Sequence, residues 1–143
     1  MKPKHIRAHL RAAAAYADCS TAEKLKVGCV LVKDHRIISI GYNGMPSGWT
    51  NVCEDESGKT NPEVIHAEAN AVAKLARSNE SGEGSVAFIT HAPCLSCAKM
   101  LYSAGVCAVI YSQPYRNTEG VNFLETCGIP VSQYFINEDE NGK

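Results

Sequence analysis

The stretches H-A-E at residues 66–68 and P-C-L-S-C at residues 93–97 decide the fold of this chain of 143 residues. They hold one imidazole and two thiols, which are ligands of the kind that zinc prefers. Three protein ligands leave the fourth position of a tetrahedral zinc open to water. The carboxylate of Glu68 stands two residues from the histidine, where it can move protons to and from that water. Together the two stretches predict a catalytic zinc centre.

The spacing within each stretch predicts how the ligands are held. Cys94 and Cys97 are three residues apart at an expected helix start, so they share one face, and a helix N-terminus favours the thiolate form. His66 and Glu68 are about 200° apart on a regular helix. Both can face one ion only if His66 is the capping residue, whose dihedrals are not helical. We therefore expect two helix N-termini to face each other across the metal.

Two structural interpretations compete with a catalytic zinc centre. A closed zinc site that only stabilises the fold requires a fourth protein ligand, for which His91 and Cys53 are the candidates. Alternatively, Cys94 and Cys97 form a redox pair, but the order of strands and helices around them is not that of thioredoxin. The presence of Glu68 beside the histidine favours the catalytic interpretation over both.

Composition limits the classes of function. The 14 Lys and Arg residues nearly balance the 15 Asp and Glu residues, and the formal net charge is −1. This balance speaks against a broad grip on nucleic acid, which needs a basic surface. We find no secretory signal and no apolar run of the roughly 20 residues that a membrane span needs. The seven cysteines, an odd number, favour a reducing compartment, and we expect a cytoplasmic protein.

Hydrophobic periodicity predicts one α/β domain over residues 1–143, with a frayed tail at 136–143. Strands that alternate with helices in the second half imply parallel pairing there, whereas the opening hairpin is antiparallel, so the five-stranded sheet is mixed. The loop 41–58 is long enough to suggest a functional role. The expected helices are 5–18, 66–77, 95–104 and 119–127, and the expected strands are 27–33, 36–42, 86–90, 106–111 and 129–136.

With these motifs in place, the chain resembles the cytidine and deoxycytidylate deaminase superfamily, whose zinc signature is H-x-E followed by P-C-x-x-C. The stretch G-Y-N-G-M-P-S-G at 41–48 looks like deoxycytidylate (dCMP) deaminases, especially the short bacteriophage versions. The similarity covers about residues 12–131. It implies a three-layer α-β-α cytidine-deaminase-like fold and a hydrolase that acts on the C–N bond of a cyclic amidine. The reaction would convert dCMP and water to dUMP and ammonia, which feeds dTTP synthesis, in the host cytoplasm if the protein is phage-encoded.

The resemblance also implies roles for individual residues. Zinc lowers the pKa of a bound water to about 7, and Glu68 is the catalytic residue that shuttles its protons. Lys24 stands where the family often has an arginine near the substrate phosphate, and a lysine supplies charge there but no bidentate fork. The implied zinc ligands are His66, Cys94 and Cys97, and the implied substrate-binding residues are Asn43, Ala67, Tyr115, Arg116 and Lys24.

Many members of the superfamily are hexamers that dCTP activates and dTTP inhibits, with Mg²⁺ accompanying the triphosphate. The resemblance therefore implies a homo-oligomer, and Arg77 falls where subunits usually meet. Some phage relatives bind a second zinc partly through cysteines. Here Ala22 and Val52 occupy two such places, Cys19 is displaced and only Cys53 remains, which speaks against a second zinc.

Other functions stay open at this point. A pocket that admits dCTP beside dCMP, or a 5-substituted cytosine, is one alternative. A tRNA adenosine deaminase or a polynucleotide cytidine deaminase shares the zinc motifs but needs a basic surface. A non-catalytic zinc protein that binds nucleotides would have no use for Glu68. Several residues also have plain structural interpretations: a turn residue for Asn43, an exposed loop for Tyr115 and Arg116, and solvated surface charges for Lys24 and Arg77.

Overall fold

The computed structural model describes residues 1–136, so all but the first residue of the predicted tail lies outside the described part. A five-stranded sheet in the order β2-β1-β3-β4-β5 forms its centre. β1 pairs antiparallel with β2 and β3, whereas β3, β4 and β5 are parallel. The predicted mixed sheet is therefore confirmed. The elements are α1 Pro3–Ala17, β1 Gly28–Lys33, β2 Arg36–Tyr42, α2 Ala67–Ala76, β3 Val86–His91, α3 Leu95–Ser103, β4 Ala108–Gln113, α4 Glu119–Thr126 and β5 Val131–Gln133.

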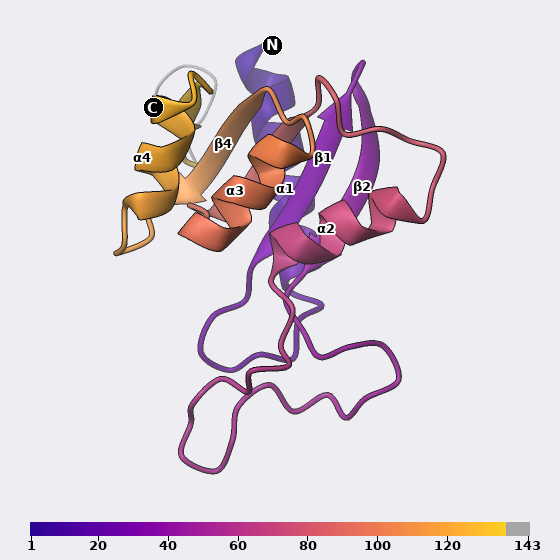
Figure 1. Ribbon diagram of the computed structural model, residues 1–143, viewed down its shortest axis with the longest axis vertical. Coiled ribbons are helices and arrows are strands. Elements are labelled where there is room, and N and C mark those ends of the chain that lie inside the picture. Colours follow the sequence, from indigo (N-terminus) through magenta and orange to yellow (C-terminus); the bar gives the residue numbers. More distant parts are fainter. Residues whose placement is uncertain (137–143) are drawn as a thin grey trace.

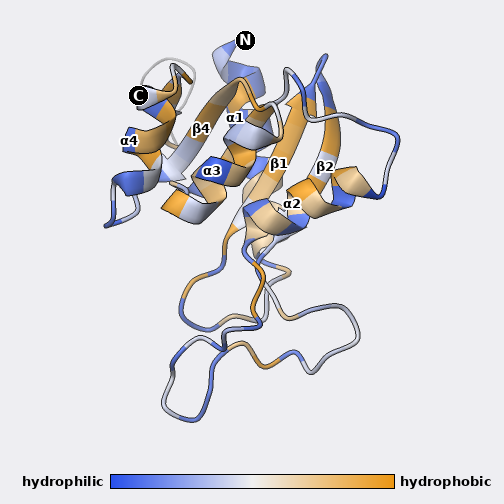
Figure 2. Cartoon of the chain, viewed as in Figure 1, coloured by the Kyte–Doolittle hydropathy of each residue, from blue (hydrophilic) through white to orange (hydrophobic). Residues whose placement is uncertain are grey.

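Helices cover both faces of the sheet (Figure 1). Leu10 and Ala13 of α1 pack on one face against Val30, Val32 and Phe88. The helices α2, α3 and α4 pack on the other face through a larger cluster of buried apolar side chains. Because β1 and β3 are covered on both sides, most of their residues are apolar and buried. Of these two strands, β1 is labelled in Figure 2, where it is mostly in the hydrophobic colours. The three-layer arrangement agrees with the expected fold class.

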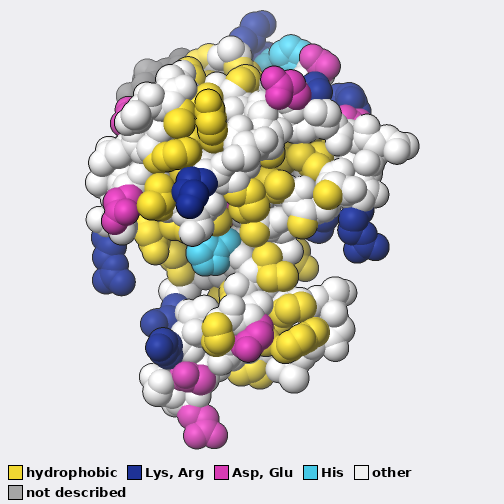
Figure 3. Space-filling view, viewed as in Figure 1, with side chains coloured by type: hydrophobic (Ala, Val, Ile, Leu, Met, Phe, Trp, Pro, Cys, Tyr) yellow, Lys and Arg dark blue, Asp and Glu magenta, His cyan; other side chains and the backbone are white. Residues whose placement is uncertain are grey.

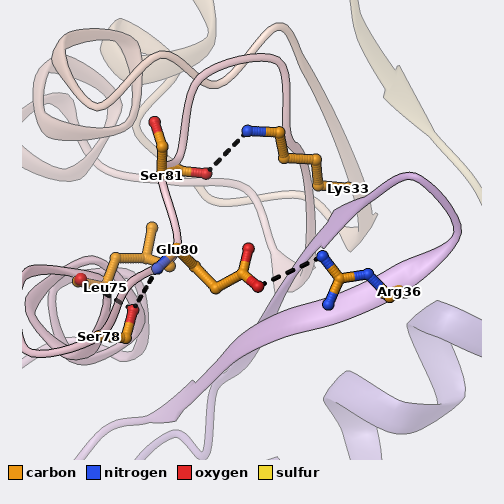
Figure 4. A network of polar contacts seen from close by, with 6 residues as sticks. All are labelled: Lys33, Arg36, Leu75, Ser78, Glu80 and Ser81. Atoms are coloured by element: carbon orange, nitrogen blue, oxygen red, sulfur yellow. Dashed lines mark hydrogen bonds and ion pairs between the residues drawn. The ribbon is translucent and has the colours of Figure 1, made fainter.

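The turn between β1 and β2 contains the predicted pair Asp34 and His35. Both residues have positive φ, 51° and 62°, as a two-residue hairpin turn of the twist-compatible type requires. The end of this hairpin is tied to the loop after α2 (Figure 4). Arg36 pairs with Glu80 at 3.3 Å, and the Lys33 ammonium donates to the Ser81 carbonyl. These exposed contacts add little stability, in the range of about 0–1 kcal/mol for a surface ion pair.

The strands β1 and β3 differ from their predicted bounds by one residue at one end, whereas β4 and β5 differ by two or more residues at both ends. The strand expected at 106–111 is β4, Ala108–Gln113, because the backbone of Val106 still donates to the Leu101 carbonyl at the end of α3. The strand expected at 129–136 is β5, with only the residues Val131–Gln133. Pro130 carries no N–H to pair with a neighbour. After β5, the backbone N–H of Tyr134 still donates to the Tyr111 carbonyl of β4.

The segments 18–27 and 43–66 extend away from one end of the sheet (Figure 1). Isolated bridges between Gly44 and Ile65 and between Glu54 and Thr60 hold the second segment together. In the space-filling view this loop lobe joins the body at a narrower waist, and histidine surface lies just above the waist (Figure 3). Within residues 1–136, no helix is long and apolar enough to cross a membrane.

Candidate active site

The two zinc motifs lie at the starts of neighbouring helices. His66 is the N-cap residue of α2, with extended dihedrals of −67° and 154°. Cys94 is the N-cap of α3, with dihedrals of −71° and 170°. This confirms the predicted capping position of His66. At this position, His66 and Glu68, which lies in the first turn of α2, can both face one ion. Each helix start brings the positive end of its dipole to the site, which favours anionic ligands.

The side chains of His66, Cys94 and Cys97 come together in space. Their ligand atoms all lie within 4.8 Å of one another. The His66 Nδ1 atom is 3.3 Å from the Cys97 sulfur and 3.6 Å from the Cys94 sulfur. A tetrahedral zinc with its usual bond lengths separates a nitrogen and a sulfur ligand by about 3.5 Å. The three residues therefore fit a zinc ion, and the exposure of the His66 side leaves a further position accessible.

Neither candidate for a fourth ligand joins the cluster. In the described part of the chain, the group that could hold a metal ion contains only the three residues above. The Nδ1 atom of His91 lies 2.9 Å from the Thr90 hydroxyl, and the Cys53 sulfur lies 3.5 Å from the hydroxyl of Thr21. The geometry is that of an open centre. Cys19 and Cys53 form no second metal cluster within residues 1–136 either.

Glu68 lies in the first turn of α2, two residues after His66, and it is only 4% exposed. Burial raises the pKa of Glu68 to about 7, and the nearby His66 opposes this rise. A carboxyl group with a pKa near neutrality can both accept and return a proton under ordinary conditions. The position and protonation of Glu68 are those of a general acid–base group beside an open metal position.

The thiols of Cys94 and Cys97 differ in pKa. Hydrogen bonds from the Cys97 thiol and from His66 lower the pKa of Cys94 to about 4, whereas the bond to Cys94 and burial raise the pKa of Cys97. Cys94 is therefore a thiolate at neutral pH, which is the form that binds metal. The bond to Cys94 also raises the pKa of His66.

A cavity of about 190 Å³ opens beside the cluster. It brings together residues from both loops, from the start of α2 and from the ends of β3 and β4. Of the sequence-predicted residues, it includes the catalytic carboxylate, two of the metal ligands and four of the five substrate residues. Its lining residues are Ala22, Lys24, Leu25, Val27, Asn43, Cys53, Glu54, Thr60, Val64, His66, Ala67, Glu68, His91, Ala92, Cys94 and Tyr115.

Two predicted residues lie elsewhere. Arg116 is exposed and does not line the cavity, although its neighbour Tyr115 does. Arg77 is the exposed C-cap residue of α2, at the opposite end of this helix from His66. A helix of ten residues is about 15 Å long, so Arg77 has no direct part in the metal cluster.

Asn43 serves the loop as well as the cavity. Its side-chain oxygen accepts the backbone N–H of Val27 at 2.8 Å, and its amide nitrogen donates to the Leu25 carbonyl at 2.8 Å. Its backbone carbonyl accepts a hydrogen bond from the Ser20 hydroxyl. Asn43 does not have positive φ, so left-handed geometry does not explain its presence. Its amide holds the segment 25–27 in place along the cavity wall.

Sequence reasoning missed Glu54, which is a buried carboxylate in the cavity wall, 9% exposed. Its oxygens accept the backbone N–H groups of Glu23 and Lys24 at 3.1–3.3 Å. Glu54 thereby fastens the loop that carries Lys24 to the loop 43–66. No local pattern in the sequence marks this contact, because it joins residues about 30 positions apart.

Gly120 allows α4 to pack closely against the start of α3, where Cys94 lies. A Cβ atom at this position of α4 would collide with the backbone of Pro93 and Cys94. The absence of a side chain thus lets the start of α4 press directly on the turn that presents the first cysteine.

The family model described as "Cytidine and deoxycytidylate deaminase zinc-binding region" matches residues 3–113. Among curated relatives, the deoxycytidylate deaminase of Saccharomyces cerevisiae is 32% identical over 97% of this chain, which spans 47% of that protein. That of Mycobacterium phage D29 is 35% identical over 70% of this chain and 85% of its own length. The chain thus spans only about half of some relatives that it matches.

Among solved structures, the dCMP deaminase from the cyanophage S-TIM5, crystallised in complex with dCMP and dUMP, is 44% identical. The alignment covers 94% of this chain and 99% of that one, with a TM-score of 0.92. The residues 3–113 that the family model matches include both zinc motifs. With this fold, these motifs and these relatives, the chain belongs to the cytidine and deoxycytidylate deaminase family.

Proposed function

We propose that this protein hydrolyses the exocyclic amine of dCMP to give dUMP and ammonia, and so supplies dUMP for dTTP synthesis. The observation that carries the proposal is the cluster of three metal ligands beside the buried Glu68, next to a cavity of about 190 Å³. The likeness to a cyanophage dCMP deaminase crystallised with dCMP and dUMP supports the choice of substrate.

In this proposal His66, Cys94 and Cys97 hold a zinc ion. The donor set of one nitrogen and two sulfurs and the nitrogen–sulfur distances of 3.3 and 3.6 Å support that choice. When bound, zinc acts as a Lewis acid that makes water a competent nucleophile near neutral pH.

Glu68 moves the protons. It accepts a proton from the attacking water and delivers it to the ring nitrogen next to the reacting carbon. It then protonates the departing amine, which leaves as ammonia. Each transfer resets the carboxylate for the next one, so a single buried acid with a pKa of about 7 serves both steps.

The remaining cavity residues orient the nucleotide. The backbone at Ala67, which is fully buried in the first turn of α2, reads the pyrimidine edge. Asn43 shapes the wall through its contacts with residues 25–27 and contacts the nucleotide from there. Lys24 and Tyr115 hold the phosphate, and the exposed Arg116 adds an outer contact through its long side chain.

The test is a set of initial rates on dCMP, dCTP, cytidine and CMP with the zinc-loaded protein. The proposal expects fast turnover of dCMP and slow turnover of cytidine, which lacks the phosphate. Comparable turnover of dCTP would instead identify a bifunctional dCMP/dCTP deaminase. A zinc-loaded protein that deaminates none of the four would overturn the mononucleotide proposal in favour of tRNA or single-stranded nucleic acid as substrate.

We also propose regulation by dCTP and dTTP, with Mg²⁺ accompanying the triphosphate. A second cavity of about 420 Å³ supports a site for such an effector, since Asn43 lines it as well as the first cavity. Gly44 to Gly48 line this cavity together with Asn70 and Lys74 of α2. Because Asn43 borders both cavities and holds the segment 25–27, an effector in the second cavity can alter the first. Adding dTTP to the dCMP assay should slow turnover, and unchanged rates would contradict the proposal.

Finally, we propose a homo-oligomer, a hexamer by its family resemblance, with Arg77 at a subunit contact and the cytoplasm as its location. The exposure of Arg77 at the end of α2 and the seven free cysteines are compatible with these assignments. Light scattering after gel filtration should give a mass several times 15.4 kDa, and Arg77→Glu should reduce it. A monomeric wild-type protein would refute the oligomer.

A further inference from the structure

His91 is the one histidine in the cavity wall that the proposed mechanism does not use. It ends β3 and lines the cavity. In the described part of the chain it is not part of the metal cluster. Its ring is half-buried, and this burial lowers the pKa of His91. A neutral imidazole carries one N–H donor, so its function depends on which nitrogen holds the hydrogen.

A short chain of hydrogen bonds decides the tautomer. The backbone N–H of Gly28 donates to the Thr90 hydroxyl oxygen at 3.1 Å, and this oxygen lies 2.9 Å from the Nδ1 atom of His91. Thr90 is only 6% exposed, and its hydroxyl hydrogen has no acceptor other than Nδ1 among the contacts of the described residues. Since a buried hydroxyl rarely leaves its hydrogen unpaired, Nδ1 is the acceptor and the ring hydrogen lies on Nε2.

His91 lines the cavity, and its Nε2–H group is then a donor that a ligand in the cavity can use. No hydrogen bond to Nε2 from residues 1–136 accompanies the contact at Nδ1. A donor that is fixed in direction and lacks a protein partner is suited to an acceptor atom of the ligand.

The sheet register indicates which part of the ligand His91 meets. His91 is the residue opposite Gln113 in the parallel pair of β3 and β4, and the Ala92 N–H donates to the Gln113 carbonyl. Tyr115 follows two residues later and lines the same cavity. His91 and Tyr115 therefore come from adjacent strand ends, at the side of the cavity where our proposed function places the phosphate.

We propose that His91 is a substrate-binding residue that donates its Nε2–H to a phosphate oxygen of the bound nucleotide, with Thr90 as the residue that fixes the tautomer. The inference rests on the proposed function. Lys24 supplies charge to the phosphate, whereas the neutral imidazole supplies direction, so the two contributions are distinct.

The test compares dUMP with deoxyuridine, which differ only in the phosphate, by calorimetric titration of the zinc-loaded protein. His91→Leu should weaken dUMP binding by about 10- to 100-fold, the range for a hydrogen bond to a charged group, and leave deoxyuridine binding nearly unchanged. His91→Gln, whose amide places an N–H near the Nε2 position, should retain most of the affinity. Equal losses for both ligands, or equal losses in both variants, would overturn the assignment.

The role of Thr90 is tested by two variants of this residue and by one measurement on the wild-type protein. Thr90→Ser keeps the hydroxyl and should bind dUMP like the wild type, whereas Thr90→Val should behave like His91→Leu. Long-range ¹H–¹⁵N correlation spectra of the wild-type protein report the tautomer directly. A hydrogen on Nε2 supports the inference, and a hydrogen on Nδ1 overturns it even if Thr90→Val does not fold. Failure of the proposed function would appear separately, as a protein that binds dUMP but does not deaminate dCMP.

Discussion

At the scale of single residues, the site depends on an acid whose charge is disfavoured by its surroundings. Glu68 is buried, and this burial raises its pKa to about 7. In water a glutamate is a carboxylate at neutral pH and returns protons poorly. Burial makes the protonated form available, as the proposed transfer of protons from water and to the leaving amine requires.

Replacement of Glu68 by Gln tests this role. The amide keeps the shape of the side chain but cannot transfer protons, so kcat for dCMP should fall by at least about 10²- to 10⁴-fold. Zinc content, measured by atomic emission, should stay at the wild-type level because His66, Cys94 and Cys97 are intact. Glu63→Gln, at an exposed position just before α2, is the control. Unchanged turnover in Glu68→Gln would contradict the role of Glu68 as the group that transfers the protons.

His9 makes a second prediction at this scale. It lies half-buried on α1 with its ring centroid 4.9 Å from that of Phe88. Burial, and then the neighbouring His5 and His35, lower the pKa of His9. In the unfolded chain the pKa is about 6.5, so just below this pH the unfolded state binds more protons. The free energy of unfolding should therefore fall as the pH drops through about 6.5, and level off below the folded pKa.

The variant His9→Phe keeps an aromatic ring against Phe88 and removes the titration. Urea unfolding between pH 5 and 7.5 should show a shallower loss of stability in this variant than in the wild type. The same slope in both proteins would mean that other groups cause the dependence.

At the scale of elements, the cavity is built by loops that hold each other. Glu54 on the loop 43–66 accepts the N–H groups of Glu23 and Lys24, and Asn43 binds the backbone at residues 25 and 27. Hydrogen bonds from Glu54 and Asn43 thus hold the segment 18–27 at residues 23–24 and at residues 25 and 27. Neither loop has regular secondary structure, so these side-chain hydrogen bonds satisfy backbone groups that strand pairing would satisfy in a sheet.

Glu54→Gln tests the fastening. In the variant, an NH₂ group replaces one of the two carboxylate oxygens, so a donor meets the backbone N–H donors of Glu23 and Lys24. The negative charge that strengthens the remaining hydrogen bonds is also lost. Because Lys24 would then be held less firmly, KM for dCMP should rise by about 10-fold with a smaller change in kcat. Glu56→Gln, at an exposed position of the same loop, is the matched control. A loss in kcat alone would place Glu54 in the chemistry instead.

At the scale of the whole molecule, the metal ligands connect two halves of the fold. His66 precedes α2, whereas Cys94 and Cys97 belong to α3, and β3 lies between these helices in the chain. An ion that binds all three fixes the two helices against each other. Since the unfolded chain cannot present the ligands in this geometry, the binding energy adds to the stability of the folded state.

Removal of zinc should therefore act on stability as well as on activity. We expect dialysis against a strong chelator to lower the Tm by several degrees and abolish turnover, with both restored by Zn²⁺ but not by Mg²⁺. Differential scanning calorimetry and dCMP assays on the same samples provide the measurement. A metal-free protein with full activity would contradict the zinc centre.

The sequence by itself determined what depends on near neighbours along the chain. The period of apolar residues predicted every helix and strand, and the conflict between His66 and Glu68 on a regular helix placed the histidine at the cap. The three ligands, the open metal position and the acid followed from residue types at fixed spacings. Such inferences succeed because helix geometry and ligand chemistry are local properties.

Only the tertiary structure decided the contacts between distant segments. It showed that β1 lies antiparallel beside β3, that Glu54 reaches the backbone of Lys24, and that Tyr115 lines the cavity while Arg116 does not. It also joined Gly28, Thr90 and His91 in one chain of hydrogen bonds. These pairings depend on how sheet order and loop paths bring together residues 30 or more positions apart, which no local spacing in the sequence encodes.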